Sequence, residues 1–396
     1  MKEWIKISDL LFFQEGPGVR NTQYTQSGVK LLNVANLVNG KVDLSTSDRY
    51  ISEDEAYGRY KHFLCDDGDF IIASSGIKVE YFDRKMGFVD SSMLPLCMNT
   101  STIRFKVIDS KRLNIKYFMY YLKSIHFKQQ LSKFITGSAQ LNFGPSHLKK
   151  MNMPLVSLKE QNNIVDKLSK VELLLDKYNG EIKLLDELIK ARFVEMFGDP
   201  IENQKDWEVV KIRDIVTDVR YGTSKPAVEG GRYPYLRMNN LTVDGGLDLS
   251  DLKYIDIPDN EIEKCVVRKG DILFNRTNSI DLIGKTAVFN LLDDMVIAGY
   301  IIRIRLNNQI LPDVFSQYMN LEAMKKVLRG MAKGAVNQAN INAQELQSIK
   351  VYIPNMELQK QYVEFKEEID KSRSRIQKSL EASQELFDSL MQEYFG

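Results

Sequence analysis

Both tryptophans of the chain open a similar phrase: Trp4-Ile5-Lys6-Ile7-Ser8-Asp9-Leu10 near the start, and Trp207-Glu208-Val209-Val210-Lys211-Ile212-Arg213-Asp214-Ile215 near the middle. Further matches follow in the same order: Leu37 with Leu241, Gly68-Asp69-Phe70-Ile71-Ile72 with Gly270-Asp271-Ile272-Leu273-Phe274, and Phe197-Gly198 with Phe395-Gly396. An ordered series along the whole chain predicts an internal duplication. The repeat is far too long for a solenoid, so each copy is expected to be a domain with an appendage.

The first part of each copy has a mixed pattern. Short β-rich runs, such as 70–73 and 101–107, lie between Gly, Asp and Asn turns, and an amphipathic stretch follows near 115–134 or 313–329. This pattern predicts an α+β domain in each copy.

The second part of each copy has helical periodicity. Pro154, Leu158 and Gln161, at the start of the first such segment, match Pro354, Leu358 and Gln361 of the second. Apolar residues then alternate at spacings of four and three, as on the seam of a coiled coil. In the first segment they are Ile164, Leu168, Val171, Leu175, Tyr178, Ile182, Leu185, Ile189 and Met196; in the second, Tyr362, Phe365, Ile369, Ile376, Leu380, Phe387, Leu390 and Tyr394. A pseudo-two-fold duplication predicts that the two helices pack antiparallel, and the alternative is two separate helices, each on its own domain.

Composition excludes several classes of protein. The 396 residues carry 54 basic and 53 acidic side chains, three cysteines and three histidines. Few and scattered cysteines argue against a disulfide framework, and few histidines against a histidine-rich metal centre. Without a long apolar run or a signal peptide, the chain is expected to be cytoplasmic and not to span a membrane.

Charge is distributed unevenly along the near-neutral chain. The stretch from Ser110 to Lys159 contains no Asp or Glu but nine Lys and Arg residues, interleaved with Tyr117, Tyr120, Tyr121 and Phe127. Basic groups beside small polar loops suit a surface that follows phosphates. The alternative is a solvated helix face over a buried aromatic stripe.

The sequence contains none of the catalytic motifs that we sought. There is no P-loop, no G-x-G-x-x-G and no H-E-x-x-H, and no glycine-rich cofactor loop with the Asn-Pro-Pro-aromatic motif of a base methyltransferase. The chain is therefore expected not to be an enzyme on its own, and to bind no metal or cofactor.

A duplicated mixed domain followed by a long helix resembles the specificity subunit of type I restriction-modification systems. The resemblance covers the full chain and is carried by Tyr221-Gly222-Thr223-Ser224-Lys225, Tyr235-Leu236-Arg237-Met238-Asn239-Asn240-Leu241 and Gly270-Asp271-Ile272-Leu273-Phe274-Asn275-Arg276-Thr277-Asn278-Ser279, besides the Trp207 phrase. The first copy departs from it, with Gly16-Pro17-Gly18-Val19-Arg20 and Ala73-Ser74-Ser75-Gly76 at the corresponding places.

The resemblance implies a fold and a set of partners. It implies target-recognition domains at 1–156 and 201–356, pseudo-symmetric and separated by a long antiparallel two-helix coiled coil, whose conserved spacer helices are 157–200 and 357–396. Each domain would read one half of a bipartite site in double-stranded DNA, and divergent loops imply different half-sites. The helices would dock two methyltransferase (modification) subunits that bind S-adenosylmethionine, and two restriction subunits that use ATP can join.

Candidate DNA-binding residues are polar or basic and lie in the predicted loops, where Arg suits guanine and Asn or Gln suits adenine. They are Arg20, Asn21, Asn33, Ser74, Ser75, Lys78, Ser138, Gln140 and Asn142 in the first copy, and Thr223, Ser224, Lys225, Arg237, Asn239, Arg276, Thr277, Asn278, Ser279, Asn337 and Gln338 in the second. Any one of them could instead stabilise a turn. The alternative functions are a coiled-coil scaffold that binds protein partners, and a self-contained methyltransferase or nuclease.

Overall fold

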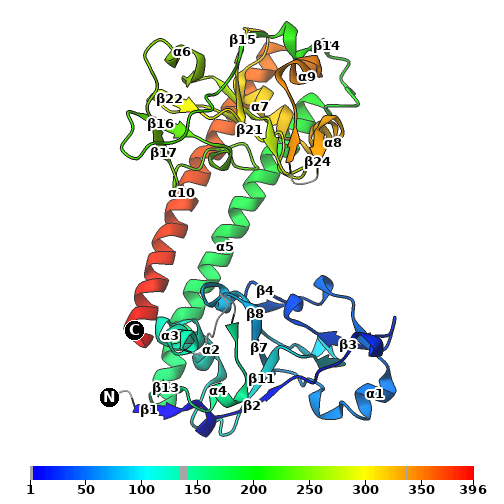
Figure 1. Ribbon diagram of the computed structural model, residues 1–396, viewed down its shortest axis with the longest axis vertical. Coiled ribbons are helices and arrows are strands. Elements are labelled where there is room, and N and C mark those ends of the chain that lie inside the picture. Colours follow the sequence, from blue (N-terminus) through cyan, green and yellow to red (C-terminus); the bar gives the residue numbers. More distant parts are fainter. Residues whose placement is uncertain (1–2, 134–140, 336–337) are drawn as a thin grey trace. The chain divides into compact units, whose positions relative to one another are not determined.

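The chain divides into two compact units in the computed structural model, which describes residues 3–133, 141–335 and 338–396 (Figure 1). The first unit joins Met1–Lys177 to Leu380–Gly396, and the second is Tyr178–Ser379. The division falls inside two 40-residue helices, α5 (Leu158–Phe197) and α10 (Met356–Phe395). Each unit therefore contains one mixed domain and one piece of each long helix.

A four-stranded antiparallel sheet forms the centre of the first unit. Its strands are, in sheet order, β2 (Leu11–Glu15), β11 (Thr102–Val107), β7 (Phe70–Ala73) and β9 (Met86–Phe88). All four residues of β7 are buried, as a continuous apolar run predicts for a strand covered on both faces. Helices α2 (Ile115–Lys123) and α3 (Ile125–Ser132) contribute Phe118 and Phe127 to the same core.

Smaller elements complete the first unit. They are the sheet β10 (Leu96–Met98), β3 (Val29–Leu32) and β6 (Tyr50–Ile51), the pairs β1 (Glu3–Lys6) with β13 (Asn152–Leu155), β8 (Ser75–Ile77) with β12 (Leu141–Asn142), and β4 (Leu37–Val38) with β5 (Lys41–Val42), and helices α1 (Glu53–Tyr57) and α4 (Pro145–Leu148). Strands β10 and β3 are parallel, although the neighbouring pairs are antiparallel.

The second unit repeats this plan. Its central sheet contains β15 (Val216–Tyr221), β23 (Ile301–Leu306), β19 (Ile272–Asn275) and β21 (Thr286–Val288), all antiparallel. Its second sheet contains β17 (Lys253–Ile255), β16 (Tyr233–Leu236), β22 (Met295–Ile297) and β18 (Val266–Val267), with β16 and β22 parallel. The recurrence of one parallel pair beside an antiparallel sheet fits the predicted duplication.

The remaining elements of the second unit flank these sheets. They are β20 (Thr277–Asn278), β25 (Gln338–Asn340) and β24 (Lys333–Ala335) in one sheet, β14 (Glu208–Lys211) paired with β26 (Lys350–Ile353), and helices α6 (Ile262–Cys265), α7 (Pro312–Asn320), α8 (Glu322–Met331) and α9 (Ala343–Ser348).

Within each unit, the pieces of α5 and α10 contact one another. In the second unit the Phe193 and Tyr362 rings meet edge to face with centroids 5.3 Å apart, and Asp186 pairs with Arg373. The α10 residue number falls as the α5 number rises, so the helices run antiparallel there. In the first unit, Lys167 Nζ lies 3.1 Å from Tyr394 Oη. The nine apolar residues predicted for the α5 seam are all buried or half-buried, so the packing confirms the predicted helix pair.

The match predicted at the start of the long helices was wrong by two residues. Gln161 donates to the carbonyls of Arg112 and Val156, and accepts from the Asn114 amide. Its structural equivalent is Gln359, which donates to the carbonyls of Gln309 and Pro354 and accepts from the Leu311 amide. Pro154 and Pro354 misled the alignment because the two prolines hold different positions relative to this glutamine.

None of the helices within the described ranges is both long enough and apolar enough to cross a membrane.

Candidate nucleic-acid interface

Three loops of the second unit meet around Arg276. The Arg276 guanidinium lies over the Tyr221 ring, 4.9 Å from its centroid, and the Arg276 amide donates to the Tyr300 carbonyl at 2.9 Å. The Tyr221 hydroxyl accepts from the Ala343 amide at 2.8 Å. The ends of β15, β19 and β22 and the start of α9 are thereby held together, and we call this group the Arg276 cluster.

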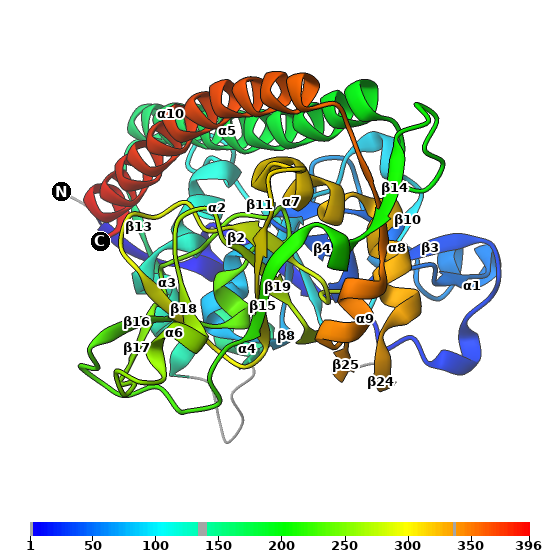
Figure 2. The same ribbon diagram turned by 90° about the horizontal axis from the view of Figure 1, so that it is seen from above.

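Strands β20 and β25 bring further candidates to the Arg276 cluster. Thr277 pairs with Asn340 across these strands, and their side-chain oxygens lie 3.2 Å apart. Asn278 donates to Asn275 Oδ1 at 2.8 Å and its own Oδ1 accepts from the Ser279 amide. Gln338, at the start of β25, is exposed on the β24–β25 hairpin, which Figure 2 shows beside α8 and α9. Asn337 lies outside the described residues.

The turn after β15 explains why a glycine follows Tyr221. A Cβ on Gly222 would lie 2.2 Å from the Ile297 carbonyl oxygen, so no larger residue fits. The Thr223 amide donates to that carbonyl at 2.9 Å. Ser224 is exposed, and Lys225 forms an ion pair with Glu261 at 2.8 Å.

Arg237 and Asn239 are placed differently from the Arg276 cluster. The Arg237 guanidinium binds Asp251, with Nη2 2.7 Å from Oδ2, and hydrogen bonds from Arg237 and Lys253 lower the pKa of the Asp251 carboxyl. Arg237 is thus already paired within its own domain, whereas Asn239 is exposed.

Part of the first unit corresponds to the Arg276 cluster. Gly16 occupies the place of Gly222, because a Cβ there would lie 2.1 Å from the Asn99 carbonyl oxygen. Ser75 lies on β8 opposite Asn142 of β12, and its hydroxyl is 2.6 Å from that of Ser101. Asn142 is exposed. Ser138 and Gln140 lie outside the described residues.

The other candidates of the first unit differ in exposure. Arg20, Asn21 and Lys78 are exposed. Asn33 is buried, where it donates to the Leu31 carbonyl and accepts from Asn99 at 2.8 Å, and Ser74 is also buried. These bonds are what the turn-stabilising interpretation of Asn33 requires. DNA contact by any of the candidates stays a prediction.

A basic groove beside Lys78 contains residues that the sequence analysis did not select. Tyr81, Arg84 and Lys85 line a groove of about 390 Å³ together with Lys78, and the Arg84 guanidinium stacks 5.0 Å from the centroid of the exposed Tyr81 ring. An exposed aromatic ring flanked by cations is typical of nucleic-acid surfaces. In the sequence these residues form only a short cluster of basic and aromatic side chains between Lys78 and Lys85, which is too small to predict a binding surface.

The described residues contain no group of three or more His, Cys, Asp or Glu side chains that could hold a metal ion. All three cysteines are buried, and burial raises the pKa of the Cys65 and Cys97 thiols to about 12, which keeps them protonated.

Family comparison agrees with the duplicated fold. The family described as "Type I restriction modification DNA specificity domain" matches residues 2–185 and again 204–384. The chain therefore belongs to the type I restriction-modification DNA specificity family and carries two copies of its domain.

Named relatives come from archaea and bacteria. The chain is 31% identical over 198 residues to a putative type I restriction enzyme specificity subunit, MjaX, of Methanocaldococcus jannaschii, covering 49% of this chain and 46% of that protein. It is 21% identical over 277 residues to the EcoKI specificity subunit of Escherichia coli K12, covering 66% and 60%. The chain thus spans about half the length of the curated relatives it matches.

A solved structure shares the fold. The S subunit of the type I restriction-modification system of M. genitalium aligns with a TM-score of 0.59 at 15% identity, covering 100% of this chain and 96% of that one.

Proposed function

We propose that the chain is the DNA-reading subunit of a type I restriction-modification complex and that each unit reads one half of a bipartite site in double-stranded DNA. One observation carries the proposal: equivalent loops of the two units carry different side chains. Ser75 and Gly76 lie on β8 where Thr277 and Asn278 lie on β20. Strand β8 pairs with β12 and β20 pairs with β25, and each of these partner strands precedes a short helix. One scaffold with two different polar surfaces suits two different half-sites.

Catalysis and cofactors are assigned to partners in this proposal. Modification subunits would bind S-adenosylmethionine and methylate DNA, and restriction subunits would use ATP. The chain itself would bind neither and catalyse no step, acting in the cytoplasm.

The long helix α5 offers a surface for a modification subunit. Leu184 and Leu188 are 63% and 45% exposed, and their spacing of four residues places them on one helix face. Exposed apolar side chains that share one helix face are a candidate protein-interaction surface.

DNA binding tests the proposal directly. The chain, assembled with the modification subunit from its own source, is expected to bind duplex DNA with an affinity that falls steeply with salt and depends on sequence. Arg276→Ala is expected to lower specific affinity by roughly tenfold, as the loss of one good base contact does. Binding that is insensitive to salt and sequence would instead favour the scaffold alternative.

A further inference from the structure

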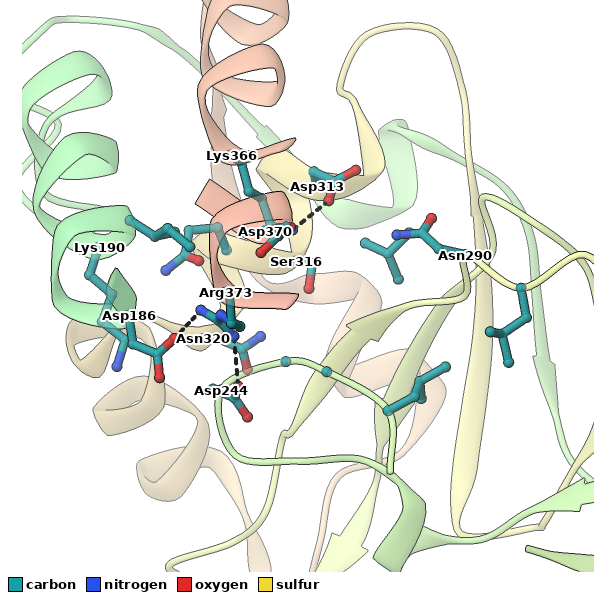
Figure 3. Close-up of a pocket in the computed structure, with 17 residues that line it drawn as sticks. Asp186, Lys190, Asp244, Asn290, Asp313, Ser316, Asn320, Lys366, Asp370 and Arg373 are labelled. Carbon is teal, nitrogen blue, oxygen red and sulfur yellow. Dashed lines mark hydrogen bonds and ion pairs between the residues drawn. The ribbon is translucent and has the colours of Figure 1, made fainter. Parts of the chain in front are cut away.

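An arginine on α10 connects three separate elements of the second unit. Arg373 pairs with Asp186 on α5 through Nη2, and its Nη1 lies 3.3 Å from Asp244, at the tip of the loop after β16 (Figure 3). About a quarter of each of the Arg373 and Asp186 side chains is exposed. A partly buried arginine that pairs with two carboxylates stabilises a fold more than a single ion pair on the exposed surface does.

The residues around Arg373 form ion pairs between neighbouring elements of the second unit. They line a cavity of about 250 Å³, in which Lys366 pairs with Asp313 of α7 at 3.1 Å and with Asp370 at 2.6 Å. Arg373 and Lys366 thus pair with four carboxylates of the cavity, and Lys190 also lines it. These ion pairs join α10 to the domain.

The loop that Arg373 holds is a tight hairpin. Leu241 and Leu247 pair across it, and the Thr242 amide donates to the Gly246 carbonyl at 3.0 Å. Gly245 has a φ of 91°, and a Cβ there would lie 2.5 Å from Asn320 Nδ2. The hairpin is therefore seated against α7 on one side and against Arg373 on the other.

This hairpin is continuous with a candidate DNA-binding segment. Residues 237–239 immediately precede it, and Lys285 Nζ donates to the carbonyls of Met238 and Leu241. Lys285 thus ties the start of the hairpin to the segment that carries Arg237 and Asn239.

The first unit has the same hairpin but a different attachment. Strands β4 and β5 form it, and Lys41 pairs with Asp176 of α5 at 3.5 Å. Both side chains are largely exposed, and the polarity is reversed, with the cation on the hairpin. With Phe197 aligned to Phe395, α5 carries Leu175 where α10 carries Arg373. The three-way arginine contact thus belongs to the second unit.

We propose that Arg373 is a positioning residue that fixes the hairpin 241–247, and with it the segment 237–239, to the pair of long helices. This proposal rests on the proposed function in one respect, because a fixed segment would read the second half-site at a fixed distance from the helices.

The first experiment measures amide hydrogen exchange in the full-length chain. Arg373→Leu, which installs the residue that α5 carries, and Asp244→Asn are expected to speed exchange of residues 238–248 about fivefold, because opening of this loop loses its ionic contact. Arg373→Lys restores part of the protection. Arg232→Leu, which breaks the exposed Arg232–Asp259 pair of the same unit, leaves this segment unchanged. Unchanged exchange in Arg373→Leu, or an equal increase throughout the second unit, overturns the proposal.

The second experiment uses the chain in complex with its modification subunit and a duplex that carries the methylated site of the source genome. The affinity for the native spacing between the two half-sites is divided by the affinity for a spacing changed by one base pair, and this ratio is expected to fall about threefold or more in Arg373→Leu. Arg276→Ala is expected to weaken binding at every spacing by the same factor. A faster-exchanging loop with an unchanged ratio overturns the positioning role. A wild-type complex without sequence-specific binding refutes the proposed function, and the exchange experiment then still decides whether Arg373 holds the hairpin.

Discussion

Arg303 is one of the largest fully buried side chains of the protein, and its charge is compensated at close range. Its guanidinium donates to Asp218 and to the Val266 carbonyl. Burial alone would raise the pKa of Asp218, but hydrogen bonds from Arg220 and Arg303 hold that pKa below its ordinary value. Arg303→Met leaves the half-buried Asp218 carboxylate with Arg220 as its remaining partner and removes a donor from the buried Val266 carbonyl, so we expect a loss of about 1–3 kcal/mol in the free energy of unfolding of the second unit.

The measurement can be confined to the second unit. In a Trp4→Phe background, Trp207 is the sole tryptophan and reports urea unfolding by fluorescence. Arg232→Met, which removes the exposed pair with Asp259, is the matched control and should change stability by less than about 0.5 kcal/mol. Equal effects of the two substitutions would show that burial of Arg303 has no energetic consequence.

Lys325 predicts a pH dependence of stability. It is buried, donates to the Gly284 carbonyl and to Asn320 Oδ1, and burial lowers its pKa from 10.5 to about 7. Between these two pH values the unfolded chain binds more protons than the folded chain, so the free energy of unfolding rises with pH. The destabilisation is complete below about pH 7 and is relieved towards pH 10.5. The stability of wild type minus that of Lys325→Met is therefore expected to rise by about 1 kcal/mol per pH unit between pH 7.5 and 9.5; a flat difference would contradict the shifted pKa.

At the scale of elements, sequence periodicity predicted the helices better than the strands. Apolar residues spaced alternately by four and three predicted both long helices, because the buried contact face of a helix pair requires that spacing over many turns. Most strands are two to four residues long, too short for an alternation to develop, and only runs such as 70–73 were visible. Gln161 and Gln359 hold equivalent backbone partners, yet the prolines drew the predicted match to Gln361. Hydrogen bonds between these glutamines and residues about 50 positions earlier in the chain determine which glutamine is equivalent, and a local sequence pattern contains no trace of such bonds.

The exposed leucines of α5 predict a partner surface. Leu184→Glu with Leu188→Glu is expected to weaken assembly with the modification subunit by at least about tenfold, since two buried apolar anchors would be replaced by charges. Because both side chains are exposed in the chain alone, its unfolding midpoint should stay within about 2 °C. Co-purification and calorimetry measure the two effects. Ser374→Glu with Lys378→Glu, an exposed pair on α10 with the same spacing of four residues, is the control, and equal weakening by both pairs would refute a specific leucine face.

For the molecule as a whole, the sequence identified the segments of the candidate interface but not the direction of each side chain. Composition and repeat order predicted that 276–279 and 338 matter, and strand pairing between β20 and β25 brings these two segments together. The sequence could not show that Arg237 binds Asp251 or that Asn33 is buried, because both depend on how loops of several residues fold back. Tyr221 beneath Arg276 was in the quoted phrase, but only the turn after β15 shows its role.

Exchange of a whole domain tests the modular arrangement that follows from two self-contained units. Each mixed domain has its own apolar core, and residues 201–356 contribute to clusters that include no residue of 1–156. Replacing 201–356 with the corresponding domain of another family member is therefore expected to change one half of the methylated site and leave the other half intact. Sequencing of methylated adenines in cells that express the chimera with its modification subunit measures both halves at once. Because the hairpin 241–247 contacts Arg373 outside the exchanged segment, a donor that lacks an acid at position 244 should also tolerate a wider range of spacings, and Arg373→Leu in the chimera should then have no further effect. A change in both halves would show that the two domains do not read DNA independently.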